Sequence, residues 1–189
     1  MTYKENKQTL LALFILMILM ATTTLTFGQT TINPDTVCAN AVGEQYFVTN
    51  TPTSTYNWTA TGGGSTIATG QGTNAITVDW GGISAQYVNA IEVIESNAAG
   101  CPGSPIFLDV FVLALSGNAI GPFCPGDPTT ALVGNPLGGS WSGTGVVANA
   151  FQPSIGVGNY VLTYSLAGCT TIINVVVNSG PVTGPIQHF

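Results

Sequence analysis

Apolar and polar residues alternate along several short segments of the chain, and a period of two predicts β-strands. In residues 55–60, Tyr56 and Trp58 share one face and Asn57 takes the other, and residues 75–80 alternate in the same way. Further strands are expected over residues 45–49, 87–95, 106–113, 129–133, 138–146, 159–166 and 169–177. No window shows a 3.6-residue period flanked by caps, so we predict an all-β chain of antiparallel β-sandwiches.

A stretch containing glycine and proline, residues 113–124, divides these strands into two sets. Its motif Ser116-Gly117-x-x-x-Gly121-Pro122 returns 63 positions later as Ser179-Gly180-x-x-x-Gly184-Pro185. A joint that recurs at module spacing is typical of a tandem array. We therefore expect a first module over residues 30–115, a smaller one over 118–178, and residues 179–189 as a tail or the start of a further repeat.

The N-terminal segment has the three regions of a secretory signal peptide. Lys4 and Lys7 precede an apolar core of residues 11–21, and a threonine-rich stretch follows. The core is short for a membrane span, which needs about 20 residues. With small residues at Thr26 and Gly28, we place the signal peptide at residues 1–28, against the alternative of an uncleaved anchor. The mature chain is then secreted or at the cell surface, without a membrane span.

The charge distribution excludes several classes of partner. Of 189 residues only 5% are charged, and no lysine or arginine occurs after position 7. A surface without cations cannot neutralise phosphates, so we expect no nucleic-acid binding. The same reasoning argues against attraction to anionic lipids. Since 45% of the residues are hydrophobic, the chain can still build cores.

Four cysteines in an exported chain indicate disulfides. They are Cys38, Cys101, Cys124 and Cys169, and they allow three pairings. We expect Cys38–Cys101 and Cys124–Cys169, because each bond would then close one module. Zinc is the alternative, but there is no Cys-x-x-Cys pair and only one histidine.

Two sets of residues resemble known repeat families. The first is Cys38…Tyr46-x-Val48…Tyr56-Asn-Trp58-Thr59-Ala60…Gly70-x-Gly72…Ile76-x-Val78-x-Trp80…Gly100-Cys101, which resembles the PKD-like repeats of secreted surface proteins from Bacteroidota. The second is Cys124-x-Gly126…Gly139-Ser-Trp141-Ser-Gly143-x-Gly145-Val146…Phe151-x-Pro153…Gly158-x-Tyr160-x-Leu162-Thr-Tyr164…Gly168-Cys169, which is similar to the Ig-like repeats found with them. The resemblance implies a part of an adhesin or gliding-motility-associated protein exported by the type IX system, although no sorting domain of that system is visible.

The sequence offers no catalytic constellation and no cofactor site. Acyl transfer needs a base beside its nucleophile, and the single histidine, His188, lies one residue from the end. Asp79, Glu92 and Asp109 lie at outward strand positions or in sheet margins, where solvated carboxylates are expected, so we predict no enzyme activity. Calcium is a weak alternative, with Asp35 and Asp127 as candidate ligands near module ends.

The aromatic residues are interpreted as core positions, because each large ring falls on the inward face of a strand pattern. They are Tyr56, Trp58, Trp80, Trp141, Tyr160 and Tyr164. A sugar-stacking platform of the three tryptophans is the alternative. Asp35-Thr36-Val37 resembles the O-glycosylation pattern of Bacteroidota, which would place a glycan on Thr36.

These observations favour a non-catalytic, exported structural or adhesion protein built of disulfide-closed β-sandwich repeats. Its partners would be other modules of the same array, surface glycans or surface proteins. One alternative is a carbohydrate-binding module with exposed aromatics. Another is a self-assembling extracellular fibre or matrix subunit, because edge strands are normally blunted by lysine and the mature chain has none.

Overall fold

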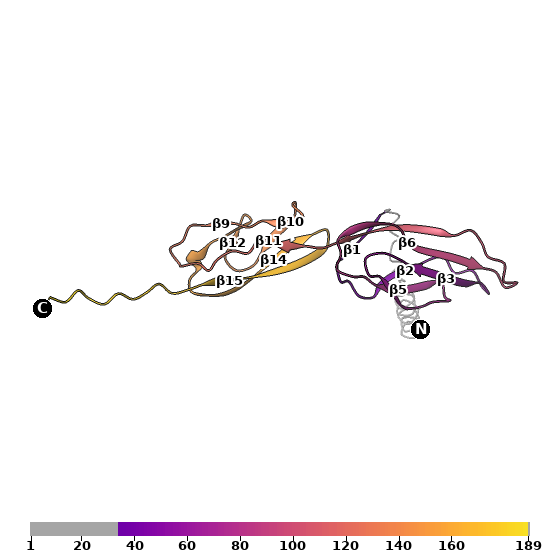
Figure 1. The fold of residues 1–189 in the computed structure, drawn as a ribbon, viewed down its shortest axis with the longest axis horizontal. Coiled ribbons are helices and arrows are strands. Elements are labelled where there is room, and N and C mark those ends of the chain that lie inside the picture. Colours follow the sequence, from indigo (N-terminus) through magenta and orange to yellow (C-terminus); the bar gives the residue numbers. More distant parts are fainter. Residues whose placement is uncertain (1–33, 189) are drawn as a thin grey trace, which may run out of the picture. The chain divides into compact units, whose positions relative to one another are not determined.

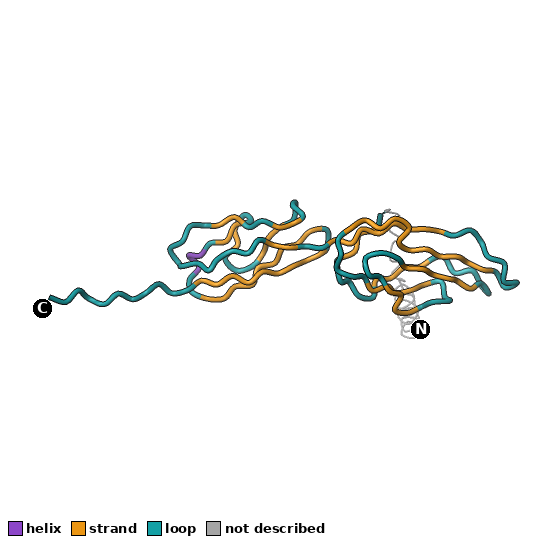
Figure 2. Tube along the Cα trace, in the orientation of Figure 1, coloured by secondary structure: helices purple, strands orange, loops and turns teal. Residues whose placement is uncertain are grey.

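A computed structural model describes residues 34–188, and these form an all-β structure with a single short 3-10 helix (Figure 2). The prediction of an all-β fold is confirmed. The predicted signal peptide, residues 1–28, lies outside the described residues. Among the residues that the structure does describe, no helix is long and apolar enough to cross a membrane.

The first sandwich contains two sheets (Figure 1). One has the order β1-β7-β6-β3, and the other has the order β2-β5-β4. All neighbours are antiparallel except β1, which runs parallel to β7. The strands are β1 (Asp35–Cys38), β2 (Glu44–Phe47), β3 (Thr55–Ala60), β4 (Thr66–Thr69), β5 (Ala75–Asp79), β6 (Ala85–Ser96) and β7 (Ile106–Leu113).

The second sandwich has shorter strands. Its largest ladder is β11-β14-β15, accompanied by β12-β13-β9 and by the pair β10-β8. The strands are β8 (Ser116–Gly117), β9 (Thr130–Ala131), β10 (Gly134–Asn135), β11 (Ser140–Ser142), β12 (Val146–Val147), β13 (Ala150–Phe151), β14 (Gly158–Leu166) and β15 (Cys169–Val177); the 3-10 helix is η1 (Pro153–Ile155).

Each sandwich encloses its own hydrophobic core. The core of the first is built on alternating positions of its strands, with Ile76 and Val78 of β5 packed with Trp58 of β3. The core of the second gathers around Trp141 and Tyr164, whose ring centroids are 5.1 Å apart. Burial of such apolar faces is the main favourable term in folding, which explains why the alternating segments became strands.

The stretch between the two sets of strands belongs in part to the second sandwich. Ser116 and Gly117 form β8 and pair with Asn135 and Gly134 of β10. The ladder therefore begins two residues before the expected module start at residue 118. At the other end, residues 178–188 contain no strand or helix and are exposed.

Candidate functional site at the joint between the sandwiches

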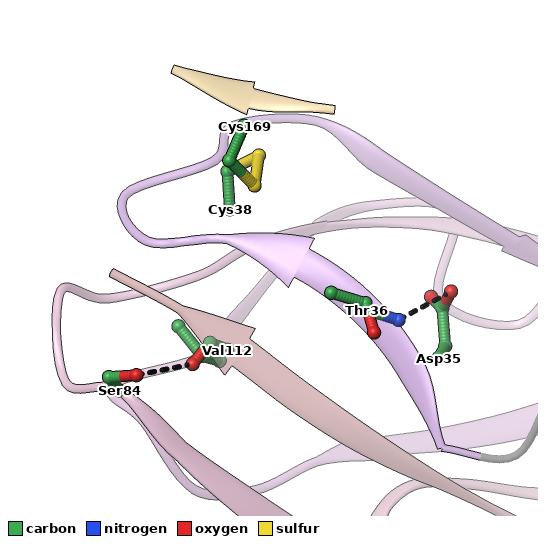
Figure 3. Close-up of a disulfide and its surroundings, with 6 residues drawn as sticks. All are labelled: Asp35, Thr36, Cys38, Ser84, Val112 and Cys169. Carbon is green, nitrogen blue, oxygen red and sulfur yellow. Dashed lines mark hydrogen bonds between the residues drawn. A yellow bond between two sulfur atoms is a disulfide. The ribbon is translucent and has the colours of Figure 1, made fainter. Parts of the chain in front are cut away.

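A disulfide joins the two sandwiches. Cys38, the last residue of β1, is bonded to Cys169, the first residue of β15, with their Cα atoms 5.5 Å apart (Figure 3). The two cysteines are 131 positions apart in sequence. Cys101 and Cys124 are free thiols, and both are exposed.

The predicted bond Cys38–Cys101 is wrong, because its two cysteines lie at opposite ends of one sheet. Cys38 pairs with Leu113, the last residue of β7. Cys101 lies in the turn before Ile106, the first residue of β7. Eight residues of strand separate the two ends, which is more than about 20 Å at roughly 3.3 Å per residue. A disulfide needs Cα atoms within about 7 Å.

The predicted bond Cys124–Cys169 is wrong for the same reason. Cys169 begins β15, and Phe123, just before Cys124, forms a parallel bridge with Val177 at the end of β15. The nine residues of this strand hold the two cysteines about 25 Å apart. Each expected bond would have had to span the length of a sandwich.

The sequence did contain a signal for the correct placement. Both Cys101 and Cys169 follow Ala-Gly, and Gly100 and Gly168 adopt positive φ angles of 80° and 82°. Glycine at a positive φ between two apolar segments marks a hairpin turn. A cysteine in such a turn cannot reach one at the opposite end of the same sheet.

The neighbourhood of Cys38 is held by hydrogen bonds within the first sandwich. The backbone N–H of Ala39 donates to the Leu113 carbonyl at 2.9 Å, and that of Asn40 donates to the Gly81 carbonyl at 3.0 Å. Close by, the Ser84 hydroxyl donates to the Val112 carbonyl at 3.1 Å (Figure 3). The disulfide is therefore attached to a fixed strand end rather than to a free loop.

The candidate calcium ligands Asp35 and Asp127 take part in local hydrogen bonds. The Thr36 N–H donates to Asp35 Oδ1 at 2.9 Å, and the Cys124 N–H donates to Asp127 Oδ2 at 2.8 Å. Within residues 34–188, no group of three or more His, Cys, Asp or Glu residues could hold a metal ion. Calcium binding at either aspartate stays a hypothesis.

Asp35 also faces a buried tyrosine. The Tyr46 hydroxyl lies 3.4 Å from Asp35 Oδ2 and donates to it. Burial raises the pKa of Tyr46 well above its usual value near 10, and the negative charges of Asp35 and Glu44 raise it further. Thr36, the candidate glycosylation site, is exposed on β1, which is an edge strand. Its modification stays a prediction.

The aromatic residues assigned to the core lie almost entirely inside it. Trp58, Trp80 and Trp141 are 4%, 4% and 7% exposed, which leaves no ring face for stacking against a sugar. Tyr56 and Tyr164 are also buried, and Tyr160 is half-buried against the second core. The alternative of a tryptophan platform for carbohydrate binding is therefore wrong.

One small cavity lies beside Trp141 and Tyr164, with a volume of about 140 Å³. Ligand pockets usually enclose about 300–1,000 Å³, so this space is smaller than a typical ligand pocket. His188 lies in the strandless segment that follows β15, where its side chain is exposed.

The first sandwich is similar to a known domain family. Residues 24–108 match a family model described as a PKD-like domain, a range that ends within β7 of the first sandwich. The match supports a PKD-like module there and covers somewhat less than half of the chain. No curated protein matches the chain.

Solved structures that resemble the chain include the insect immune protein hemolin, at 12% identity and a TM-score of 0.39, with 84% of this chain and 49% of that chain covered. Domains 3–5 of Drosophila OTK align at 12% identity and a TM-score of 0.33, covering 78% and 59%. The titin fragment I67–I69 aligns at 14% identity and a TM-score of 0.29, covering 79% and 64%. The chain spans about half the length of the hemolin chain it matches.

Proposed function

We propose that this chain is a non-catalytic structural or adhesion module of an exported surface protein, in which the Cys38–Cys169 bond carries tension across the joint. A disulfide is typical of proteins in oxidising compartments outside the cytosol. The family resemblance extends this proposal to the repeat-containing surface proteins of Bacteroidota, including those that accompany gliding motility and type IX secretion. Surface proteins or glycans, or further modules, would be its partners.

The position of the bond determines the path of force. Tension applied at the two ends runs along β1 to Cys38, across the disulfide to Cys169, and along β15. The polypeptide between the two cysteines lies outside this path. Both strands on the path are already extended, at about 3.3 Å per residue. The disulfide-bonded chain should therefore lengthen little under load.

Single-molecule stretching of residues 29–189, with handles on both termini, tests this proposal. With the bond intact, only the segments outside the two cysteines can extend. After reduction, the segment between Cys38 and Cys169, which are 131 positions apart, can also extend. This adds about 450 Å to the extended length at roughly 3.4 Å per residue. The Cys38→Ser variant should give the longer extension without reductant. Equal extensions of the wild type before and after reduction would overturn the proposal.

A further inference from the structure

The free Cys124 occupies the same kind of position as the bonded Cys38. Cys38 is the last residue of β1, which runs parallel to β7, the last strand of the first sandwich. It pairs with Leu113, the last residue of β7. Cys124 follows Phe123, which pairs in parallel with Val177 at the end of the last strand of the second sandwich. We refer to Cys38 and Cys124 as the strand-end cysteines.

The free Cys101 likewise corresponds to the bonded Cys169. Each follows a glycine in the turn between the last two strands of its sandwich, β6–β7 for Cys101 and β14–β15 for Cys169. We refer to these two as the turn cysteines. The disulfide in the structure thus joins the strand-end cysteine of the first sandwich to the turn cysteine of the second. One cysteine of each kind remains free.

The remaining pair lies where a second copy can reach it. Cys101 is at the end of the first sandwich away from Cys38, and Cys124 is at the end of the second away from Cys169. Apolar side chains are exposed near each thiol. At the Cys101 end of the first sandwich these are Ile106 and Phe107, which begin β7 and are 63% and 45% exposed. At the Cys124 end of the second they are Ile155 and Val157, at 37% and 59% exposed, which come just before Gly158, the β14 partner of Val177.

The chain that follows the second sandwich also repeats the chain that follows the first. Ser116-Gly117 comes shortly after β7, and Ser179-Gly180 comes shortly after β15. The end of the second sandwich therefore offers a joint of the same design as the end of the first. The end of the second sandwich carries the strand-end cysteine Cys124. The end of the first sandwich away from Cys38 carries the matching turn cysteine, Cys101.

We propose that Cys124 of one copy forms a disulfide with Cys101 of a second copy, reproducing the Cys38–Cys169 joint between chains. The two ends are different surfaces, so the contact is heterologous and each added copy leaves one end of each kind free. Such a contact produces a head-to-tail linear polymer. The exposed apolar residues become buried at the contact.

The bond forms by oxidation of two thiols. The S–H bonds of Cys101 and Cys124 break, a sulfur–sulfur bond forms, and two protons and two electrons leave. A disulfide oxidant accepts the electrons and protons and becomes two thiols. In the exported compartment this oxidant is a thiol–disulfide oxidoreductase, and in the test tube it is oxidised glutathione.

Complementary single variants give a sharp test. Residues 29–189 are prepared as Cys101→Ser, which keeps only the Cys124 thiol, and as Cys124→Ser, which keeps only the Cys101 thiol. Each is incubated with oxidised glutathione at low micromolar concentration, alone and mixed in equal amounts. Non-reducing electrophoresis and mass spectrometry of chymotryptic peptides then identify the linked cysteines. The folded state of each variant is checked by its thermal midpoint.

We expect each variant alone to remain monomeric and the mixture to form a dimer through a Cys101–Cys124 bond. The wild type should form a ladder of oligomers that reductant removes. Homodimers of one variant that form as readily as the mixed dimer would overturn the proposal, because they would show random oxidation. A monomeric wild type with an internal Cys101–Cys124 bond, or with both thiols free, would overturn it as well.

The proposed polymer and the proposed tension-bearing role of the disulfide are tested by separate experiments. The Cys101→Ser, Cys124→Ser double variant cannot polymerise through these thiols, yet it retains Cys38–Cys169 and the force path described above. Its stretching behaviour tests the proposed function alone. The mixing experiment tests the contact between copies alone.

Discussion

The side-chain amide of Gln71 takes the place of a neighbouring strand beside Trp58. The backbone N–H of Trp58 donates to Gln71 Oε1 at 2.9 Å, and Gln71 Nε2 donates to the backbone carbonyl of Trp58 at 2.8 Å. Trp58 lies on β3, an edge strand of its sheet. The second sandwich uses a similar device, because the N–H of Trp141 on the edge strand β11 donates to Asn149 Oδ1 at 2.8 Å.

These amides cover polar groups that an edge strand would otherwise present to another chain. Natural proteins often protect such edges with lysine, and no lysine occurs after position 7 of this chain. We expect Gln71→Ala to lower the free energy of unfolding by about 1–2 kcal/mol, since two hydrogen bonds are lost at a part-buried site. Urea titration measures the change. Gln45→Ala, at an exposed position on β2, is the control and should have little effect.

The disulfide pairing predicts how the four cysteines differ in stability experiments. Under oxidising conditions, Cys38→Ser and Cys169→Ser should each lower the free energy of unfolding by about 2–5 kcal/mol, because a long covalent loop is opened. Cys101→Ser and Cys124→Ser, which remove exposed free thiols, should leave the monomer unchanged. Thermal denaturation with and without reductant measures the difference. A large loss for Cys101→Ser would contradict the observed pairing.

Gly117 is needed because the second core packs against its backbone. A Cβ atom at this position would stand against the ring of Trp141 and 2.9 Å from Ile173 Cγ2. We expect Gly117→Ala to cost about 1–3 kcal/mol through overpacking. Gly180, its counterpart in the repeated motif, has no atom within 4 Å of the corresponding Cβ. Gly180→Ala is therefore the control, and an equal loss of stability in both variants would refute the steric explanation.

The buried Tyr46 predicts a loss of stability in alkali. Its pKa is raised in the folded state, chiefly by burial and also by Asp35, whereas in the unfolded chain it stays near 10. Below pH 10 both states keep the proton, and the free energy of unfolding is insensitive to this group. Above pH 10 the unfolded state loses the proton first, so stability falls by up to about 1.4 kcal/mol per pH unit.

Urea titrations of the wild type and of Tyr46→Phe at pH 8, 10 and 11 measure this contribution. The variant should lose less stability between pH 10 and 11 than the wild type does. The difference in free energy of unfolding between the two proteins at pH 8 measures the loss of the hydroxyl itself, including its 3.4 Å hydrogen bond to Asp35. Identical alkaline losses in the two proteins would show that Tyr46 is not the responsible group.

The hydrophobic pattern determined the long strands. Segments with several alternating positions, such as β3, β7 and β15, form within a residue or two of where the pattern places them. Their burial follows the same alternation, as Tyr56 and Trp58 show on β3. Strands of two residues have no period to detect, so β8, β10 and β13 were missed. The four-residue strand β1 was missed as well, and β4 carries a register shift between Ile67 and Thr69 that obscures its pattern.

Only the tertiary structure decided which cysteines are bonded. The sequence predicted export, disulfides and two sets of strands, but not which cysteines are bonded. The pairing depends on which strand ends and turns meet in space. Cys38 and Cys101 are neighbours in the order of cysteines along the chain, yet the rigid length of β7 separates them. Cys38 and Cys169 are 131 positions apart and meet because the end of one sandwich faces a turn of the other.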